Sequence, residues 1–296
     1  MRKTASAQKK TNYINLGCGR THHPDWQNFD VNPREDNVEA WNARSGIPLV
    51  SNSAVVVYHS HLLEHLEKQD GINLLEECFR VLLPENGILR IVVPDLEDIC
   101  RSYLDAIERA EHQNEGALED LNWMRLELVD QLTRIKSGGL MLDFLNSDPP
   151  NKLFILKRCG KQVEEHLISP KRSRTTQSEH KPSPIPTHLR LKKLLLHLSN
   201  INNWKEIFVK GILGPKEYEY LQIGRFRTDG EIHHCMYDRF SLRSLLETIG
   251  FTDIRITTAN KSCIPHWKEY QLDADKNGIP HKPDSLYVEA RKPQSS

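Results

Sequence analysis

The sequence of 296 residues has no net charge and no long apolar run. Forty lysine and arginine residues balance forty aspartate and glutamate residues. This balance excludes a chain that is basic over its whole surface, as a general nucleic-acid binder would be, and it also excludes an acidic solvating tail. No apolar stretch reaches the roughly 18 residues of a membrane-spanning helix, so we do not expect an integral membrane protein.

Paired cysteine motifs are also missing. The six cysteines are scattered, none forms a Cys-x-x-Cys pair, and no group of histidines and cysteines has the spacing of a zinc site. We therefore expect reduced thiols, a cytoplasmic location and no bound metal. The opening MRKTASAQKK lacks the apolar segment of a secretory signal, and we expect a disordered tail over 1–11.

The neutral total conceals a basic stretch. Residues 152–193 hold eleven lysines and arginines against three acidic residues. Within it, 169–186 is rich in serine, proline and basic residues, which predicts a mobile loop, and Leu189–Leu198 has the pattern of a basic amphipathic helix. The stretch could be an exposed lid, a contact with a membrane surface or a lipid-linked substrate, or a nucleic-acid contact. Its lack of aromatic residues speaks against nucleic acid.

Residues 12–98 are predicted to alternate between strands and helices. Tyr13–Leu16 is a short apolar run, and Ala54–Tyr58 is a continuous apolar run typical of a strand buried on both faces. Ile88–Val93 is another strand-like run. Apolar residues three and four positions apart predict a helix over 71–82. Strand, helix and strand with short connections indicate a parallel sheet.

The chain continues with a helical pattern from about 98 to 135 and regains strands near its C-terminus. Ser241 is the expected N-cap of a helix that ends at Gly250, where a glycine is favoured. Strands are predicted over Thr252–Thr258 and Leu286–Ala290.

Three polar segments follow predicted strands. Gly17 and Gly19 end the first strand, where glycines let a backbone turn tightly and approach a ligand. Asp30 lies eleven residues beyond Gly19, and a carboxylate there suits a ribose diol. Ser60 and His61 directly follow the next strand, at the edge of an open sheet where ligands bind. A plain turn and a capped helix start are the alternatives for these segments.

These segments, in this order, resemble the class I S-adenosylmethionine-dependent methyltransferases. They are similar to a bacterial subgroup whose segments read roughly LNLGCG, SHVLEHL and RVLKPGG-x-LRIAVPDLE, where this chain has INLGCG, SHLLEHL and RVLLPENGILRIVVPDLE. The C-terminal GEIHHCMYD and PDSLY also resemble that subgroup. The resemblance covers about residues 12–105 and 224–292, and it is specific for the cofactor rather than for the substrate.

The resemblance implies a Rossmann-like α/β fold with a mostly parallel seven-stranded sheet, an antiparallel last strand and a helical insertion. It implies S-adenosyl-L-methionine as cofactor, with Asp30 on the ribose hydroxyls. The cofactor-binding residues that it implies are Asn15, Gly17, Cys18, Gly19, Asp30, Asn42, Ala43, Ser60, His61 and His65. Asn42 departs from the aspartate that the family often has there. Glu85-Asn86 replaces a glycine pair, and we expect Asn86 to take up the left-handed backbone of that turn.

The segment 231–238 carries four polar groups just ahead of a helix. We interpret it as lying over the acceptor pocket, with Tyr237 and Asp238 as catalytic residues and His61 or His234 as the general base. The alternative is that Asp238 caps the next helix and Tyr237 packs with its hydroxyl outward.

We therefore predict a methyltransferase domain over 12–99 and 226–292, with a mostly helical insertion over 100–225. The predicted reaction is O-methylation of a sugar, a polysaccharide precursor or another small metabolite. The predicted partner is a small-molecule or glycan acceptor rather than nucleic acid, with a peripheral membrane contact left open and no indication of oligomeric state. Arg225 and Arg227 are candidates for an acidic acceptor group. The rival hypotheses are methylation of RNA or protein, and a non-catalytic cofactor-binding subunit.

Overall fold

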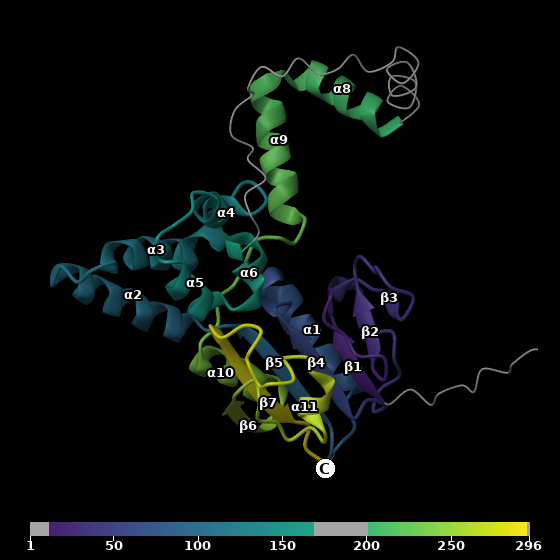
Figure 1. Ribbon diagram of the computed structural model, residues 1–296. Coiled ribbons are helices and arrows are strands. Elements are labelled where there is room, and N and C mark those ends of the chain that lie inside the picture. The colour runs from purple at the N-terminus through teal and green to yellow at the C-terminus, as the bar shows by residue number, and fades with distance from the viewer. Residues whose placement is uncertain (1–11, 169–200, 295–296) are drawn as a thin grey trace, which may run out of the picture. The chain divides into compact units, whose positions relative to one another are not determined.

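The computed structural model describes residues 12–168 and 201–294 (Figure 1). The expected tail over 1–11, the loop over 169–186 and the helix over Leu189–Leu198 lie outside the described residues. The described chain divides into two compact units. The first takes in 12–134, 138–167 and 232–294, and the second takes in 135–137, 168 and 201–231.

The first unit is built on one seven-stranded sheet with the order β3-β2-β1-β4-β5-β7-β6. The first five strands run parallel, and β7 pairs antiparallel with both β5 and β6. The expected sheet, mostly parallel with an antiparallel last strand, is confirmed. The strands are β1 (Tyr13–Leu16), β2 (Gln27–Asp30), β3 (Val38–Ala40), β4 (Val56–Ser60), β5 (Ile88–Pro94), β6 (Thr252–Thr257) and β7 (Ser285–Arg291).

Alternate residues of the central strands supply two separate cores, because successive side chains of a strand point to opposite faces. On β4, Val57 belongs to the core of one face, and Val56 and Tyr58 belong to the core of the other. Helices α1 (Lys68–Val81) and α10 (Arg239–Ile249) contribute buried leucines to the first core. Every residue of β5 is buried, which explains why this stretch of the sequence is apolar apart from Arg90.

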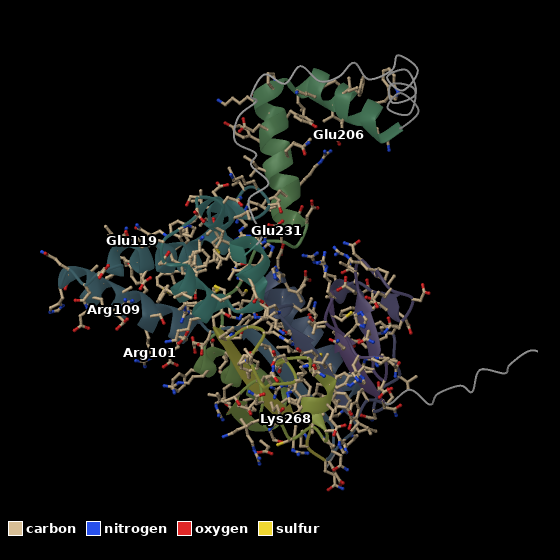
Figure 2. All side chains as sticks on the ribbon, viewed as in Figure 1. Arg101, Arg109, Glu119, Glu206, Glu231 and Lys268 are labelled. Atoms are coloured by element: carbon tan, nitrogen blue, oxygen red, sulfur yellow. The ribbon has the colours of Figure 1, made fainter. Side chains whose placement is uncertain are left out.

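The second face of the sheet is covered in part by an irregular segment, 258–284. This segment contains only one short helix, α11 (Trp267–Tyr270), whose residue Lys268 is labelled in Figure 2. Trp267 packs edge-on against Trp26 and Tyr58, with ring centroids 6.2 and 5.4 Å apart. Aromatic rings therefore fill the space that a crossover helix often takes in an open α/β sheet.

A group of helices follows β5 in the same unit (Figure 1). Their bounds are α2 (Leu96–Glu111), α3 (Ala117–Thr133), α4 (Gly139–Asn146), α5 (Lys152–Cys159) and α6 (Lys161–Ile168). They enclose their own apolar cluster, which includes Trp123, Met124 and Ile155. Arg101 and Arg109 of α2 (Figure 2) pair with Glu97 and Asp105 one helical turn earlier.

The turn before β5 corrects one prediction. The left-handed residue is Glu85, with a φ of 65°, and Asn86 is not among the positive-φ residues of the described chain. Gly87 is also irreplaceable there, because an added Cβ would lie 2.4 Å from the Leu83 carbonyl oxygen.

The second unit contains α8 (Ile201–Leu213) and α9 (Pro215–Thr228). Glu206 of α8 (Figure 2) accepts hydrogen bonds from Tyr218 and Arg225 of α9 at 2.7 and 2.6 Å. The guanidinium of Arg225, a candidate for acceptor recognition, is thus paired within its own unit. No helix among the described residues is both long and apolar enough to cross a membrane.

Helix α10 begins at a capping box, which gives a first testable prediction. Asp238 Oδ1 accepts from the backbone N–H groups of Phe240 and Ser241, and Ser241 Oγ accepts from the Asp238 N–H. The N-cap is therefore Asp238, and the expectation that Ser241 holds that position was wrong. Asp238→Ala is expected to lower the free energy of unfolding by about 1 kcal/mol in urea titrations, since the cap is lost.

Ser244→Ala is the matched control for the cap, because Ser244 lies exposed inside the same helix. Alanine is a better helix former than serine, so no destabilisation is expected. Loss of turnover in Asp238→Ala without any loss of stability would contradict the capping role and favour the catalytic one.

Candidate functional site

A cavity of about 260 Å³ opens beside the carboxyl ends of β1 and β4. We call it the first cavity. Parallel strands bind ligands at this edge of an open sheet. Six of the predicted site residues line it: Asn15, Gly17, Cys18, Gly19, Ser60 and His61.

The glycine turn after β1 forms one wall of the first cavity. Gly17 and Gly19 have φ values of 62° and 54°, in the left-handed region that favours glycine. A Cβ on Gly17 would lie 3.0 Å from Leu62 Cδ1, which is tighter than ordinary contact. The amide of Asn15 donates to the Thr21 carbonyl at 3.1 Å and so holds the far end of the turn.

Cys18 lies within the same turn. Burial raises the pKa of the Cys18 thiol to about 12, so this cysteine is a packing residue rather than a nucleophile.

Asp30 ends β2 and is tied to that turn. Its Oδ2 accepts from the Gly19 N–H and its Oδ1 from the Asn32 N–H, both at 2.8 Å. A carboxylate has about four acceptor sites, so two backbone bonds leave capacity for the hydroxyls of a ligand. Asp30 therefore sets the position of Gly19 and keeps acceptor capacity next to the first cavity.

Asn42 and Ala43 are not among the residues that line the first cavity. Asn42 is the N-cap of the 3₁₀ helix η1 (Ala43–Ser45), and its side chain accepts from the Arg44 N–H at 3.0 Å. Ala43 packs against the core beneath. The structure gives both residues a local structural role, and their contact with adenine stays a prediction.

The lining residues that were not predicted from the sequence include three polar ones with printed hydrogen bonds: Tyr58, Asp273 and Lys282. Asp273 accepts from the Tyr58 hydroxyl at 2.6 Å and from Arg90 Nε at 2.8 Å. Lys282 Nζ donates to Ser60 Oγ at 3.1 Å, and burial lowers the pKa of Lys282 to about 8. Tyr58 is hidden in an apolar strand and the other two lie in the irregular segment 258–284, so no periodic pattern marks them.

A second cavity, of about 200 Å³, shares His61 with the first. Its lining combines polar and apolar side chains from α3, α4, the segment before α10 and the segment before β7, including Gln131, Met141, His233 and Asp284. Burial is the main cause that raises the pKa of Asp284, to about 7. Glu127, also in the lining, is fixed by ion pairing with Arg158.

His61 is the one predicted site residue that lines both cavities. Its φ is 52°, and its backbone N–H donates to the Val92 carbonyl at 2.9 Å. The ring is held between two elements, with Nε2 2.9 Å from Ser285 Oγ and Nδ1 3.2 Å from Glu64 Oε1. Burial is the main cause that holds the pKa of His61 well below its usual value, so the ring is neutral near pH 7.

His65 belongs to the second cavity rather than to the first. It ends the 3₁₀ helix η2 (Leu63–His65), and its Nδ1 lies 3.0 Å from the Ile232 carbonyl oxygen. Its ring meets the ring of His233 edge-on, with centroids 4.8 Å apart. The structure thus brings His233, the histidine next to the predicted base His234, to the cavity wall.

The remaining predicted catalytic residues, His234, Tyr237 and Asp238, line neither cavity. The backbone N–H of His234 donates to the Glu64 carbonyl at 2.7 Å. Tyr237 is 8% exposed and belongs to the core, and a Cβ on Gly71 would lie 3.5 Å from its hydroxyl. The alternative that its hydroxyl points outward was therefore wrong, and its catalytic role stays a prediction.

Neither a family model nor a curated protein matches the chain. Similar solved structures include a SAM-dependent methyltransferase from Archaeoglobus fulgidus, 12% identical over 95% of this chain and 85% of that chain, with a TM-score of 0.36. Phosphoethanolamine N-methyltransferase 2 from Haemonchus contortus is 11% identical over 97% and 50% of the two chains, with a TM-score of 0.35. PKMT2 from Rickettsia typhi is 10% identical over 97% and 49%, also with a TM-score of 0.35.

The fold of this chain is therefore assigned from its own strand topology. The strand order differs from the doubly wound order 3-2-1-4-5-6 by the antiparallel β7 between β5 and β6. With the glycine turn at the end of β1, this order is the Rossmann-like α/β sheet with an antiparallel last strand that the sequence resemblance implied.

Proposed function

We propose that the chain is an S-adenosylmethionine-dependent methyltransferase that methylates a hydroxyl group of a small molecule, such as a sugar or a polysaccharide precursor. The observation that carries the proposal is the position of His61 between two cavities. A methyl donor in the first cavity and an acceptor in the second would meet at this side chain. Holding two reactants in line is the main task of an enzyme for this reaction.

The residues of the first cavity suit this cofactor. Gly17 and Gly19 bring backbone to the cavity wall without a side chain. Asp30 is not itself a lining residue, but it is bonded to the Gly19 N–H and has acceptor capacity left for ribose hydroxyls. Lys282 offers a cation for the carboxylate of the methionine part. The bound cofactor supplies a methyl group on a sulfonium.

The second cavity suits a hydroxyl-rich acceptor. Gln131, His233 and Asp284 offer donors and acceptors within one wall, and Met141 and Met236 offer apolar surface. In the proposed reaction an oxygen–methyl bond forms, the sulfur–methyl bond breaks, and the hydroxyl proton passes to a base. His61 is the residue best positioned to take that proton, since it lines both cavities.

Cofactor affinity tests the proposal through Asp30. Asp30→Ala removes a charged acceptor for the ribose and the tie to Gly19. We expect S-adenosylmethionine to bind about 10- to 100-fold more weakly in isothermal titration, as the loss of hydrogen bonds to a charged group implies. Asp36→Ala is the matched control, because Asp36 is an exposed carboxylate in the loop after β2. No binding by the wild type, or equal affinity in Asp30→Ala, would overturn the proposal.

The acceptor class needs a separate measurement. S-adenosylhomocysteine formation should be assayed with free sugars, nucleotide-linked sugars, RNA and protein extracts. Turnover with the sugars supports the proposal. Turnover on RNA that falls steeply with salt would favour a macromolecular acceptor instead, and cofactor binding with no product from any extract would favour a non-catalytic subunit.

A further inference from the structure

Three side chains at the second cavity form a group with the composition of a metal site. They are Glu64 and His65 of η2 and His233 of the segment before α10. One ligand atom from each lies within 4.8 Å of the others. Because His233 is far from the other two in the sequence, no spacing motif reveals the group.

The carboxylate of Glu64 is buried without a matching donor. Its side chain is 0% exposed, and neither oxygen has a hydrogen-bond partner. His61 Nδ1 lies 3.2 Å from Oε1, within ion-pair distance but without a hydrogen bond. A buried carboxylate of this kind is costly unless a proton or a cation neutralises it, and buried polar groups without partners are rare.

The two histidines are arranged as ligands often are. His65 Nδ1 lies 3.0 Å from the Ile232 carbonyl oxygen, which requires a proton on Nδ1 and leaves the lone pair on Nε2. A metal-binding histidine commonly makes this bond to a carbonyl with its other nitrogen. His233 is 3% exposed, and its Nδ1 is buried with no partner. Its backbone N–H, by contrast, is fixed by the Gln131 carbonyl at 3.0 Å.

We propose that Glu64, His65 and His233 bind one divalent transition-metal ion at the wall of the second cavity. Two imidazoles and one carboxylate are typical of zinc and of iron(II), manganese or cobalt sites, whereas magnesium and calcium prefer oxygen ligands throughout. Bonds near 2.1 Å in a tetrahedral site put the ligand atoms about 3.4 Å apart. Side-chain rotations that move each ligand atom by about 1 Å would bring the three atoms to that separation.

Three protein ligands leave at least one coordination position open, as catalytic metal sites do. Two of the three ligands, His65 and His233, line the second cavity, so an ion held by them would be within reach of the proposed acceptor. A hydroxyl bound there loses its proton more readily, because the cation stabilises the negative oxygen. This role rests on the proposed methyltransferase function, whereas the binding of the ion itself does not.

Metal binding by the untagged full-length chain tests the inference. After dialysis against a chelator, the wild type is expected to bind one equivalent of Co²⁺, seen as visible d–d absorption, and one of Zn²⁺ in isothermal titration. Glu64→Gln and His233→Gln each remove one ligand with little change in volume. Each should weaken binding by at least about 100-fold, since even supporting residues contribute 10- to 100-fold.

The matched control is His234→Gln. His234 neighbours His233 in the chain but is not part of the three-residue group, so Co²⁺ affinity should be unchanged. Thermal unfolding adds a second measurement that identifies misfolded variants. Zn²⁺ should raise the midpoint of the wild type and of His234→Gln, but not that of Glu64→Gln or His233→Gln.

Three results would overturn the inference: no Co²⁺ binding by the wild type, binding that survives Glu64→Gln and His233→Gln, or binding lost in His234→Gln. Titration of the same samples with S-adenosylmethionine separates this inference from the proposed function. Cofactor binding without metal binding contradicts only the metal site. Metal binding without cofactor binding leaves the metal site in place and contradicts the methyltransferase.

Discussion

Arg90→Met is expected to lower the free energy of unfolding by about 3–5 kcal/mol, the usual result of breaking a buried ion pair. For a chain of this size the midpoint of thermal unfolding should fall by on the order of 10 °C. Arg90 lies in the middle of β5, and its side chain is 0% exposed. Differential scanning calorimetry measures both quantities.

The reason for so large an effect is the number of groups that depend on this guanidinium. Arg90 pairs with Asp273 at 2.7 Å and with Glu289 at 2.6 Å, and it donates to the carbonyl oxygens of Thr258 and Lys261. Its guanidinium also lies 4.3 Å from the centroid of Trp267. Methionine keeps the apolar contact with the ring, but it leaves two buried carboxylates without their counter-ion and removes a donor from two carbonyl oxygens.

Arg255→Met is the matched control, because Arg255 is also a strand arginine paired with an aspartate. Its side chain is 60% exposed, so the unfolding midpoint should hardly move. Adding Asp273→Asn and Glu289→Gln to Arg90→Met should recover part of the lost stability, since no buried charge is then left over. Equal stability of Arg90→Met and Arg255→Met would contradict the proposed role of the charge cluster.

The strand β5 could be predicted from the sequence, but the charged residues that pair with Arg90 inside it could not. Periodicity and glycine positions predicted β1 and β5 nearly to the residue, because buried parallel strands need uninterrupted apolar runs. One charged residue, Arg90, stands inside that run. Its partners Asp273 and Glu289 lie about 180 and 200 residues further along, and no local pattern links them.

The candidate site was predictable to the extent that it lies at strand ends. The glycine turn with Gly17 and Gly19 follows β1, Ser60 is the last residue of β4, and His61 comes directly after it. Because β1 and β4 are parallel neighbours, the topology alone brings these residues together at the first cavity. Lys282 and Asp273 reach the same cavity from an irregular segment, which leaves no period in the sequence. The expectation of no metal rested on the lack of spaced ligands, and the proposed site shows the weakness of that criterion when one ligand is remote.

Helix capping explains why two residues that were predicted to belong to the site have another role in the structure. Asn42 was expected at the cofactor site because of the family resemblance, and Asp238 was expected to be catalytic because it is one of four polar groups just ahead of a helix. In the structure each accepts a backbone N–H at the start of a helix. Asparagine and aspartate are among the preferred N-cap residues. When one of them directly precedes a predicted helix, capping should therefore be considered before a catalytic role.

His61→Asn is expected to reduce the turnover number by on the order of 10²- to 10⁴-fold, the usual contribution of a positioned acid–base group. Asparagine is the conservative choice here, because it also tolerates the left-handed backbone that His61 adopts, with a φ of 52°. The fold of the turn should therefore survive while the ring between the two cavities is lost. Initial rates of S-adenosylhomocysteine formation at saturating cofactor measure the effect.

The affinity for S-adenosylmethionine should change by no more than a few-fold in His61→Asn, because the glycine turn and Asp30 are untouched. His281→Asn is the matched comparison: His281 also lines the first cavity but not the second. Its replacement should therefore cost far less turnover. Ser285→Ala, which removes the hydroxyl 2.9 Å from His61 Nε2, should give an intermediate loss, since the ring is then less firmly oriented. Turnover retained within threefold in His61→Asn would mean that the methyl group is not transferred where the two cavities meet.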